Sequence, residues 1–139
     1  MEQLIHNSED KEVVVDLWQR CGLLRQWNDP YKDIARKLLV QSDWFLVGIV
    51  DLEVVSTVMA GFEGHRGWIN YLAVDPEFQR QGLGRKMMNE AERLLQDFGC
   101  PKINLQIRED NLEAIKFYEC IGFSEDKVVS FGKRLIADD

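Results

Sequence analysis

The fold is decided by Val74-Asp75-Pro76-Glu77-Phe78-Gln79-Arg80-Gln81-Gly82-Leu83-Gly84-Arg85, which joins an apolar stretch to a long segment of helical periodicity. The first turn of a helix has backbone N–H groups without intrahelical partners and carries the positive end of the helix dipole, so it attracts anions. Gly82 and Gly84 remove side chains that would keep a pyrophosphate away, and Arg80 and Arg85 add positive charge. The stretch predicts a phosphate site, with a tight structural turn as the alternative.

The composition is that of one ordinary globular domain. The chain has 139 residues, of which 45% are hydrophobic and 29% charged, so we expect residues 1–139 to form a single domain. The net charge of -7 makes nucleic acid an unfavourable partner, because proteins that bind it usually present a basic face. No apolar stretch is long enough to span a membrane, and the N-terminus does not resemble a secretory signal. We therefore expect a cytoplasmic protein without a membrane partner.

The cysteines give no sign of a framework or a metal site. Cys21, Cys100 and Cys120 form an odd set without a C-x-x-C pair, which argues against disulfides and against structural zinc. We expect reduced, partly buried cysteines and no metal ion.

Hydrophobic periodicity predicts two short helices and several strands in the first half of the chain. The expected order begins with a strand at residues 3–6, a helix from a cap at Asn7 or Ser8 to about Arg20, and a second helix opened by Pro30. Three strands forming a meander are expected next, at residues 44–50, 54–62 and 68–74.

The second half adds a long helix, a strand and a last helix. Apolar residues recur at helical spacing from the glycine turn to Phe98, a strand is expected at residues 102–107, and Asn111 caps the final helix. Because a strand, a crossover helix and a further strand are normally parallel, the strand at residues 68–74 should lie beside the one at 102–107. Residues 123–135 have room for two terminal strands. Exposed terminal strands permit pairing between subunits, so a homodimer is one expectation.

Two motifs in this order make the chain similar to the GNAT superfamily of N-acetyltransferases. Gln79-Arg80-Gln81-Gly82-Leu83-Gly84 resembles the pyrophosphate loop of that family, Gln/Arg-x-x-Gly-x-Gly/Ala. The second motif consists of Asn111, Ala114, Phe117-Tyr118 and Ile121-Gly122-Phe123. Three further segments resemble the small YpeA-type acetyltransferases, namely Trp27-Asn28-Asp29-Pro30, Gly64-His65-Arg66-Gly67 and Gly132-Lys133-Arg134-Leu135-Ile136.

The resemblance implies an α/β fold with a mixed central sheet of about six to seven strands and four helices. It also implies a V-shaped splay between the fourth and fifth strands, where acetyl-CoA binds. The implied cofactor residues are Leu72, Val74, Gln79, Arg80, Gln81, Gly82, Leu83, Gly84, Arg85, Asn111 and Tyr118. In this interpretation the Val74 main chain pairs with pantetheine, and the Leu72 N–H, near an expected bulge, stabilises the oxyanion. Leu72 could instead be an ordinary ladder residue, and Asn111 could serve only as a helix cap.

The resemblance also implies the reaction. A primary amine attacks acetyl-CoA directly in a ternary complex without a metal, and Tyr118 protonates or hydrogen-bonds the departing thiolate. Without the resemblance, Tyr118 would be interpreted as a core aromatic residue. The competing hypotheses are a non-catalytic acyl-CoA-binding or regulatory module and an interaction protein without a cofactor. The acceptor is a small-molecule amine or a protein or peptide amine, and variable loops select between them.

No motif marks the base that takes the proton from the acceptor. Glu109, which follows the fifth strand, is the first candidate, and Glu63, His65, Asp29 or a water chain are the alternatives. Loop carboxylates are mostly exposed structure, so each of these residues could equally be solvated surface. A Cys–His nucleophile is disfavoured because no motif brings His65 to Cys100.

Overall fold

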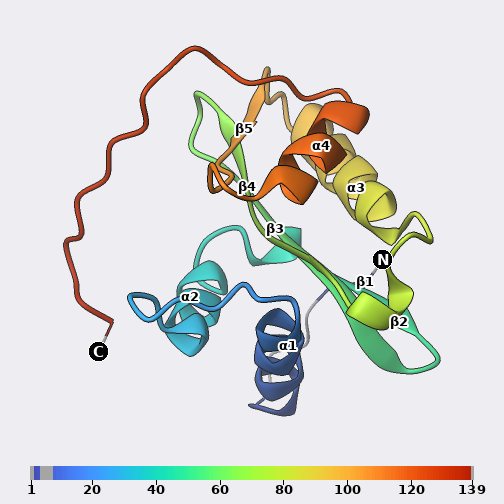
Figure 1. The fold of residues 1–139 in the computed structure, drawn as a ribbon. Helices are drawn as coiled ribbons and strands as arrows, with labels where there is room; N and C mark the ends of the chain where they lie inside the picture. The colour runs from blue at the N-terminus through green and yellow to red at the C-terminus, as the bar shows by residue number, and fades with distance from the viewer. Residues whose placement is uncertain (1, 4–7, 139) are drawn as a thin grey trace.

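The computed structural model describes residues 2–3 and 8–138, and Figure 1 shows how its elements are arranged. The elements are β1 (Glu2–Gln3), α1 (Ser8–Arg20), α2 (Pro30–Lys37), η1 (Ser42–Trp44), β2 (Phe45–Val50), β3 (Glu53–Phe62), β4 (Gly67–Val74), η2 (Pro76–Phe78), α3 (Leu83–Asp97), β5 (Ile103–Leu105) and α4 (Leu112–Cys120). The four expected helices are confirmed. Residues 4–6 of the first expected strand and the candidate cap Asn7 lie outside the described residues.

The strands form one mixed sheet in the order β1-β2-β3-β4-β5. The first four strands are antiparallel, and β4 pairs with β5 in parallel, as predicted. The parallel pairing ends at Ile69 and Leu105, whereas β4 continues to Val74. Residues 70–74 therefore have no partner strand on that side among the described residues, and β4 and β5 part where the family resemblance implies a splay.

Helices cover both faces of the sheet (Figure 1). α1 and α2 pack on one face and α3 on the other, so the molecule has two cores. Along β2, Phe45 and Val47 enter the first core while Leu46 enters the second, because successive side chains of a strand point to opposite faces.

A β-bulge interrupts β4 next to the point where β4 and β5 part. Thr57 pairs with Ala73, but Met59 pairs with Asn70, so three residue steps of β4 lie opposite two of β3. Tyr71 within this bulge has a backbone φ of 52°, which residues other than glycine rarely adopt. The expected bulge is confirmed.

The expectation of six to seven strands is wrong for the described part of the chain, which forms five. Residues 123–138 form no strand, and residues 124–138, here called the C-terminal arm, run around the outside of the molecule from α4 to the side of α2 (Figure 1). The arm contacts the region of β5 through side chains, in the pairs Lys102–Asp126 and Gln106–Ser130. Strand propensity expresses how well a residue fits a half-buried pleated surface, and the arm lies on no such surface in its own chain.

Candidate active site

The glycine turn places the N-terminus of α3 at the surface. Gly82 precedes α3 with a φ of 81°, and its carbonyl accepts the hydrogen bond of the Lys86 N–H at 3.0 Å. A Cβ atom at Gly82 would have nothing within 4 Å, so glycine is required there by the backbone conformation. Arg80 and Arg85 are exposed on either side. The turn thus presents free helix N–H groups and two guanidinium groups to solvent.

Gly84 has a role that the sequence interpretation missed. A Cβ atom at Gly84 would lie 3.1 Å from Cζ of Phe117, which is closer than ordinary van der Waals contact. The glycine therefore allows α3 to approach α4, in addition to any effect on phosphate access.

The main chain of Val74 is already engaged. Its carbonyl accepts hydrogen bonds from Sγ of Cys21 and from Nε2 of Gln79, both at 3.2 Å. Gln79 therefore folds back on the strand end. Leu72 lies at the bulge, and its side chain packs against the second core.

Tyr118 stands in an aromatic group on α4. Its ring contacts Phe117 and Phe123 edge-on, with centroid distances of 5.1 and 5.6 Å. Burial raises the pKa of Tyr118 to about 12, so the phenol stays neutral at physiological pH and keeps its proton to donate.

Asn111 caps α4, as one of its two interpretations predicts. Its Oδ1 accepts a hydrogen bond from the Ala114 N–H at 3.1 Å. This contact fixes the start of the helix that carries Tyr118.

Two of the candidate bases serve the fold. Glu63 accepts hydrogen bonds from the backbone N–H groups of His65 and Arg66 and from Nε1 of Trp68. The Arg66 contact is the main cause that holds the pKa of Glu63 below its ordinary value. Asp29 caps α2 by accepting from the backbone N–H groups of residues 31 and 32.

Glu109 is an exposed residue in the loop that follows β5. With Arg108 and Asp110 it borders a surface cavity of about 380 Å³. The Arg108 guanidinium lies 5.7 Å from the ring centroid of Trp27, whose side chain is half exposed. The loop between α1 and α2 therefore meets the loop after β5 through this pair.

His65 and Cys100 have different surroundings. His65 is exposed next to Arg66, while Sγ of Cys100 donates to the Lys102 carbonyl at 3.3 Å. In the described part of the chain no cysteine forms a disulfide; Cys120 is exposed, and Cys21 and Cys100 are partly buried. No group of three or more His, Cys, Asp or Glu side chains in that part could hold a metal ion. None of its helices is long and apolar enough to cross a membrane.

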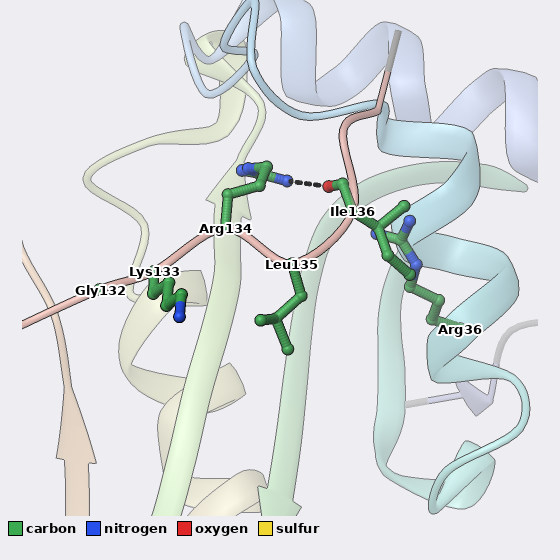
Figure 2. A pocket seen from close by; sticks show the side chains of 6 residues that line it. All are labelled: Arg36, Gly132, Lys133, Arg134, Leu135 and Ile136. Carbon is green, nitrogen blue, oxygen red and sulfur yellow. Dashed lines mark hydrogen bonds between the residues drawn. The ribbon is translucent and has the colours of Figure 1, made fainter.

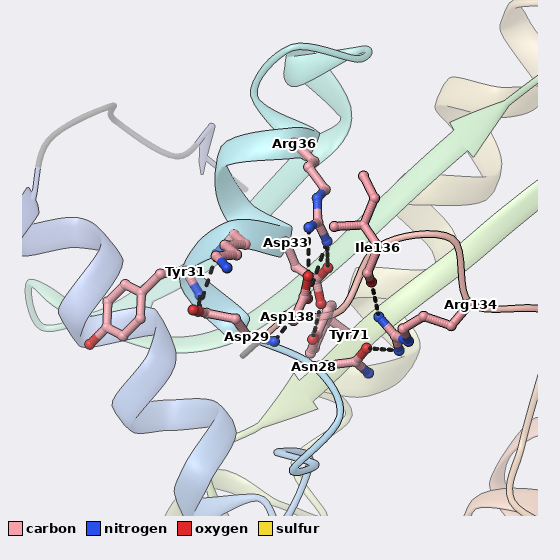
Figure 3. A network of polar contacts seen from close by, with 10 residues as sticks. Asn28, Asp29, Tyr31, Asp33, Arg36, Tyr71, Arg134, Ile136 and Asp138 are labelled. Atoms are coloured by element: carbon pink, nitrogen blue, oxygen red, sulfur yellow. Dashed lines mark hydrogen bonds and ion pairs between the residues drawn. The ribbon is translucent and has the colours of Figure 1, made fainter.

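A polar network between α2, β4 and the arm escaped the sequence interpretation (Figure 3). The Tyr71 hydroxyl donates to Oδ2 of Asp33 at 2.6 Å, and Nη1 of Arg36 donates to Oδ1 of Asp33 at 3.3 Å. Burial, followed by the bond to Asp33, raises the pKa of Tyr71. In the sequence, the feature that could have pointed to this network is the position of Asp33 beside Ile34, the buried residue of α2. Nothing in the sequence pairs Asp33 with a strand residue.

The arm is fastened to the same network. Nη2 of Arg36 donates to Oδ1 of Asp138 at 2.7 Å, and the Asp29 N–H donates to Oδ2 of Asp138 at 3.0 Å. Arg36 is the main cause that holds the pKa of Asp138 well below its usual range. Nη2 of Arg134 donates to Oδ1 of Asn28 at 2.7 Å.

An open cavity of about 550 Å³ lies between the arm and α2. Figure 2 shows its lining, which consists of Arg36 and the arm residues Gly132, Lys133, Arg134, Leu135 and Ile136. The cavity is therefore on the face of the sheet that carries α2, whereas Tyr118 packs with the core on the opposite face.

Known proteins share this architecture. The family model described as acetyltransferase (GNAT) family matches residues 11–123. The ribosomal-protein-S18-alanine N-acetyltransferase from Escherichia coli is 25% identical with a TM-score of 0.71, over 87% of this chain and 76% of that chain. PH1933 from Pyrococcus horikoshii OT3 is 24% identical with a TM-score of 0.75, over 95% and 89%. AAC(6')-Iy, in complex with the bisubstrate analog CoA-S-monomethyl-acetylneamine, is 17% identical with a TM-score of 0.72, over 93% and 95%.

Proposed function

Because this chain belongs to the acetyltransferase (GNAT) family and is an acyl-CoA-dependent acetyltransferase, we propose that it moves an acetyl group from acetyl-CoA to a primary amine by direct attack. The observation that carries the proposal is the bulged end of β4, which has no partner on its β5 side among the described residues and continues through η2 and the glycine turn to the exposed N-terminus of α3. A thioester arm can lie along the strand end while its pyrophosphate lies at the helix.

Acetyl-CoA would be held mainly by backbone groups. Residues 82–85 offer N–H groups to the pyrophosphate, and Arg80 and Arg85 are free to approach it from the surface. Gln79 bonds to the Val74 carbonyl in the free protein, and we expect pantetheine to compete for that carbonyl. Gln81, Leu83, Gly84 and Asn111 complete the proposed cofactor residues.

The proposed reaction uses one group from the end of β4 and one from α4. The amine nitrogen attacks the thioester carbon, a C–N bond forms, and the Leu72 N–H stabilises the oxyanion. The C–S bond then breaks, and the neutral Tyr118 phenol hydrogen-bonds or protonates the thiolate. The products are an acetylated amine and CoA, and no metal takes part.

Two classes of amine are candidates for the acceptor. A ribosomal-protein-S18-alanine N-acetyltransferase and AAC(6')-Iy share the fold, so a protein or peptide amine and a small-molecule amine are the two candidates. Thiol release from acetyl-CoA should be measured with a panel of peptides, polyamines and aminoglycosides. We expect release with at least one class. CoA binding without release on any acceptor would favour a non-catalytic module, and absence of CoA binding by calorimetry would contradict the proposal.

We also propose that the chain forms a homodimer through its arm. Large apolar side chains on the arm are exposed, namely Val128, Val129, Phe131, Leu135 and Ile136, and no strand among the described residues pairs with the outer edge of β5. A second copy could cover both features. We expect light scattering to give a dimer mass for the wild type and a monomer mass for Phe131→Ser. Leu52→Ser, which changes an equally exposed side chain in the β2–β3 hairpin, should stay dimeric. A monomeric wild type would contradict this proposal.

The YpeA-type subgroup stays a prediction from the three segments that resemble it. The general base is the remaining gap in the mechanism. Glu109 stays a candidate, since it is exposed at the end of β5.

A further inference from the structure

The bulge in β4 places a residue with a strained backbone one position before the proposed oxyanion donor. Tyr71 holds a φ of 52° and immediately precedes Leu72. Its ring stacks on Trp18, with centroids 3.8 Å apart and an angle of 11° between the planes. Such strain persists only where surrounding contacts impose it. The Tyr71 hydroxyl is thus held in one place, on the α2 side of the sheet.

That hydroxyl points at a carboxylate. Oδ2 of Asp33 accepts its hydrogen bond at 2.6 Å, across 38 residues of sequence, and Figure 3 shows the two side chains meeting between α2 and β4. Among the described residues, the other oxygen of Asp33 has only one contact, from Arg36 at 3.3 Å. Because each carboxylate oxygen has two acceptor positions, Asp33 can accept a further hydrogen bond from a bound amine.

The neighbouring carboxylates, Asp29 and Asp138, already have structural partners. Asp29 caps α2. The side chain of Asp138 is fully buried and binds Arg36 together with the Asp29 N–H, whereas the side chain of Asp33 is 24% exposed. Among these three residues, Asp33 combines a partly exposed side chain with a direct hydrogen bond to the bulge residue Tyr71.

We propose that Asp33 binds the ammonium group of the acceptor and takes its proton, and that Tyr71 positions the Asp33 carboxylate. This inference rests on the proposed acetyl transfer. A proton passes from the ammonium nitrogen to Asp33, and the freed lone pair attacks the thioester carbon. As the C–S bond breaks, a second nitrogen proton goes to the departing thiolate through Tyr118 or solvent. The products are the amide, CoA and one proton, which Asp33 returns to solvent.

Tyr71 from β4 and Arg36 from its own helix contact Asp33, and the charges of Asp138 from the arm and Asp29 from the cap lie close enough to act on Tyr71. The pKa values of Tyr71 and Arg36 are raised and that of Asp138 is lowered. These three groups therefore keep their charge states over the neutral and mildly alkaline range in which an amine titrates.

The test compares acceptor kcat/KM at two pH values in wild type, Asp33→Asn, Asp33→Glu and Tyr71→Phe. At about pH 7 we expect Asp33→Asn to lose about 100-fold, since the amine arrives protonated. At about pH 10 the loss should shrink to within about threefold, because the free amine then needs no base. Asp33→Glu should restore part of the rate at about pH 7.

Controls separate catalysis from structure. Asp97→Asn, at an exposed end of α3, should match the wild type at both pH values. CoA affinity by calorimetry should be the same in all variants. If Asp33→Asn does not fold, Tyr71→Phe carries the test, with a smaller loss of about threefold to tenfold at about pH 7.

Two results would overturn the inference. An unchanged rate in Asp33→Asn, or a loss of the same size at both pH values, would show that Asp33 takes no proton, while wild-type transfer would leave the proposed function intact. A wild type that transfers acetyl to no amine at either pH would instead overturn the proposed function, and this inference with it.

Discussion

The two sides of the candidate site are built in different ways. The donor side, from the end of β4 to the first turn of α3, offers backbone N–H groups from consecutive residues. The acceptor side joins side chains that are far apart in the chain, such as Tyr71 with Asp33 and Arg36 with Asp138. Backbone N–H groups suit a ligand that a whole family shares. Side chains suit an acceptor that varies, because one substitution changes one contact.

The largest expected effect comes from removing the group on the donor side that contacts the departing thiolate. Tyr118→Phe removes the phenol that hydrogen-bonds the thiolate while keeping the ring contacts with Phe117 and Phe123. We expect steady-state kcat to fall by about 100-fold with little change in CoA affinity. Tyr31→Phe, at an exposed ring on α2, should leave kcat unchanged. An unaltered kcat in Tyr118→Phe would remove Tyr118 from the mechanism.

The second effect concerns the packing beneath the donor side. Gly84→Val places a side chain against Phe117, where a Cβ alone would come within 3.1 Å. We expect the free energy of unfolding to fall by about 2 kcal/mol, measured by chemical denaturation. Gly132→Val, which meets no atoms within 4 Å, is the matched control. Equal stability of the two variants would mean that α3 and α4 do not require this glycine.

The third effect separates phosphate binding from backbone strain. Gly82→Leu and Gly22→Leu both put a side chain at a positive φ with open space around it, so each should cost about 1–2 kcal/mol of stability. Only Gly82→Leu should also weaken CoA binding, by about tenfold in calorimetry, because its side chain stands over the helix N–H groups. Equal CoA affinity in the two variants would overturn the loop assignment.

The smallest effect concerns the attachment of the arm. Arg36 and the Asp29 N–H hold the pKa of Asp138 below its unfolded value. The stabilisation is therefore fully present above the unfolded pKa of about 3.9 and is lost as the pH falls below it. Thermal unfolding midpoints should drop more steeply below about pH 4 in wild type than in Asp138→Asn. Parallel curves would show that the Asp138 contact contributes nothing in solution.

The donor side could be predicted from the sequence because its information is local. Helical periodicity and two glycines within three residues specify the turn, and the helical crossover between the two strands specifies the parallel β4–β5 pairing. The sequence interpretation of Gly84 was incomplete because the close approach of this residue to Phe117 depends on how two helices pack. The Asp33–Tyr71 contact depends on tertiary structure in the same way.

The arm shows where a local pattern misleads. Val128, Val129 and Phe131 have strand propensity, but a strand also needs a partner ladder. Within the described residues, side-chain contacts along its length hold the arm, from Lys102–Asp126 to Arg36–Asp138. Such contacts need no strand. Long-range contacts thus decided each feature that the sequence did not reveal.

The most direct test of this division is a titration of isotope-labelled protein with CoA, followed residue by residue through backbone amide chemical shifts. We predict that the largest shifts fall on residues 72–74 and 82–85, with α2 and the arm nearly unchanged. Large shifts on α2 and the arm, with residues 82–85 unaffected, would contradict the account.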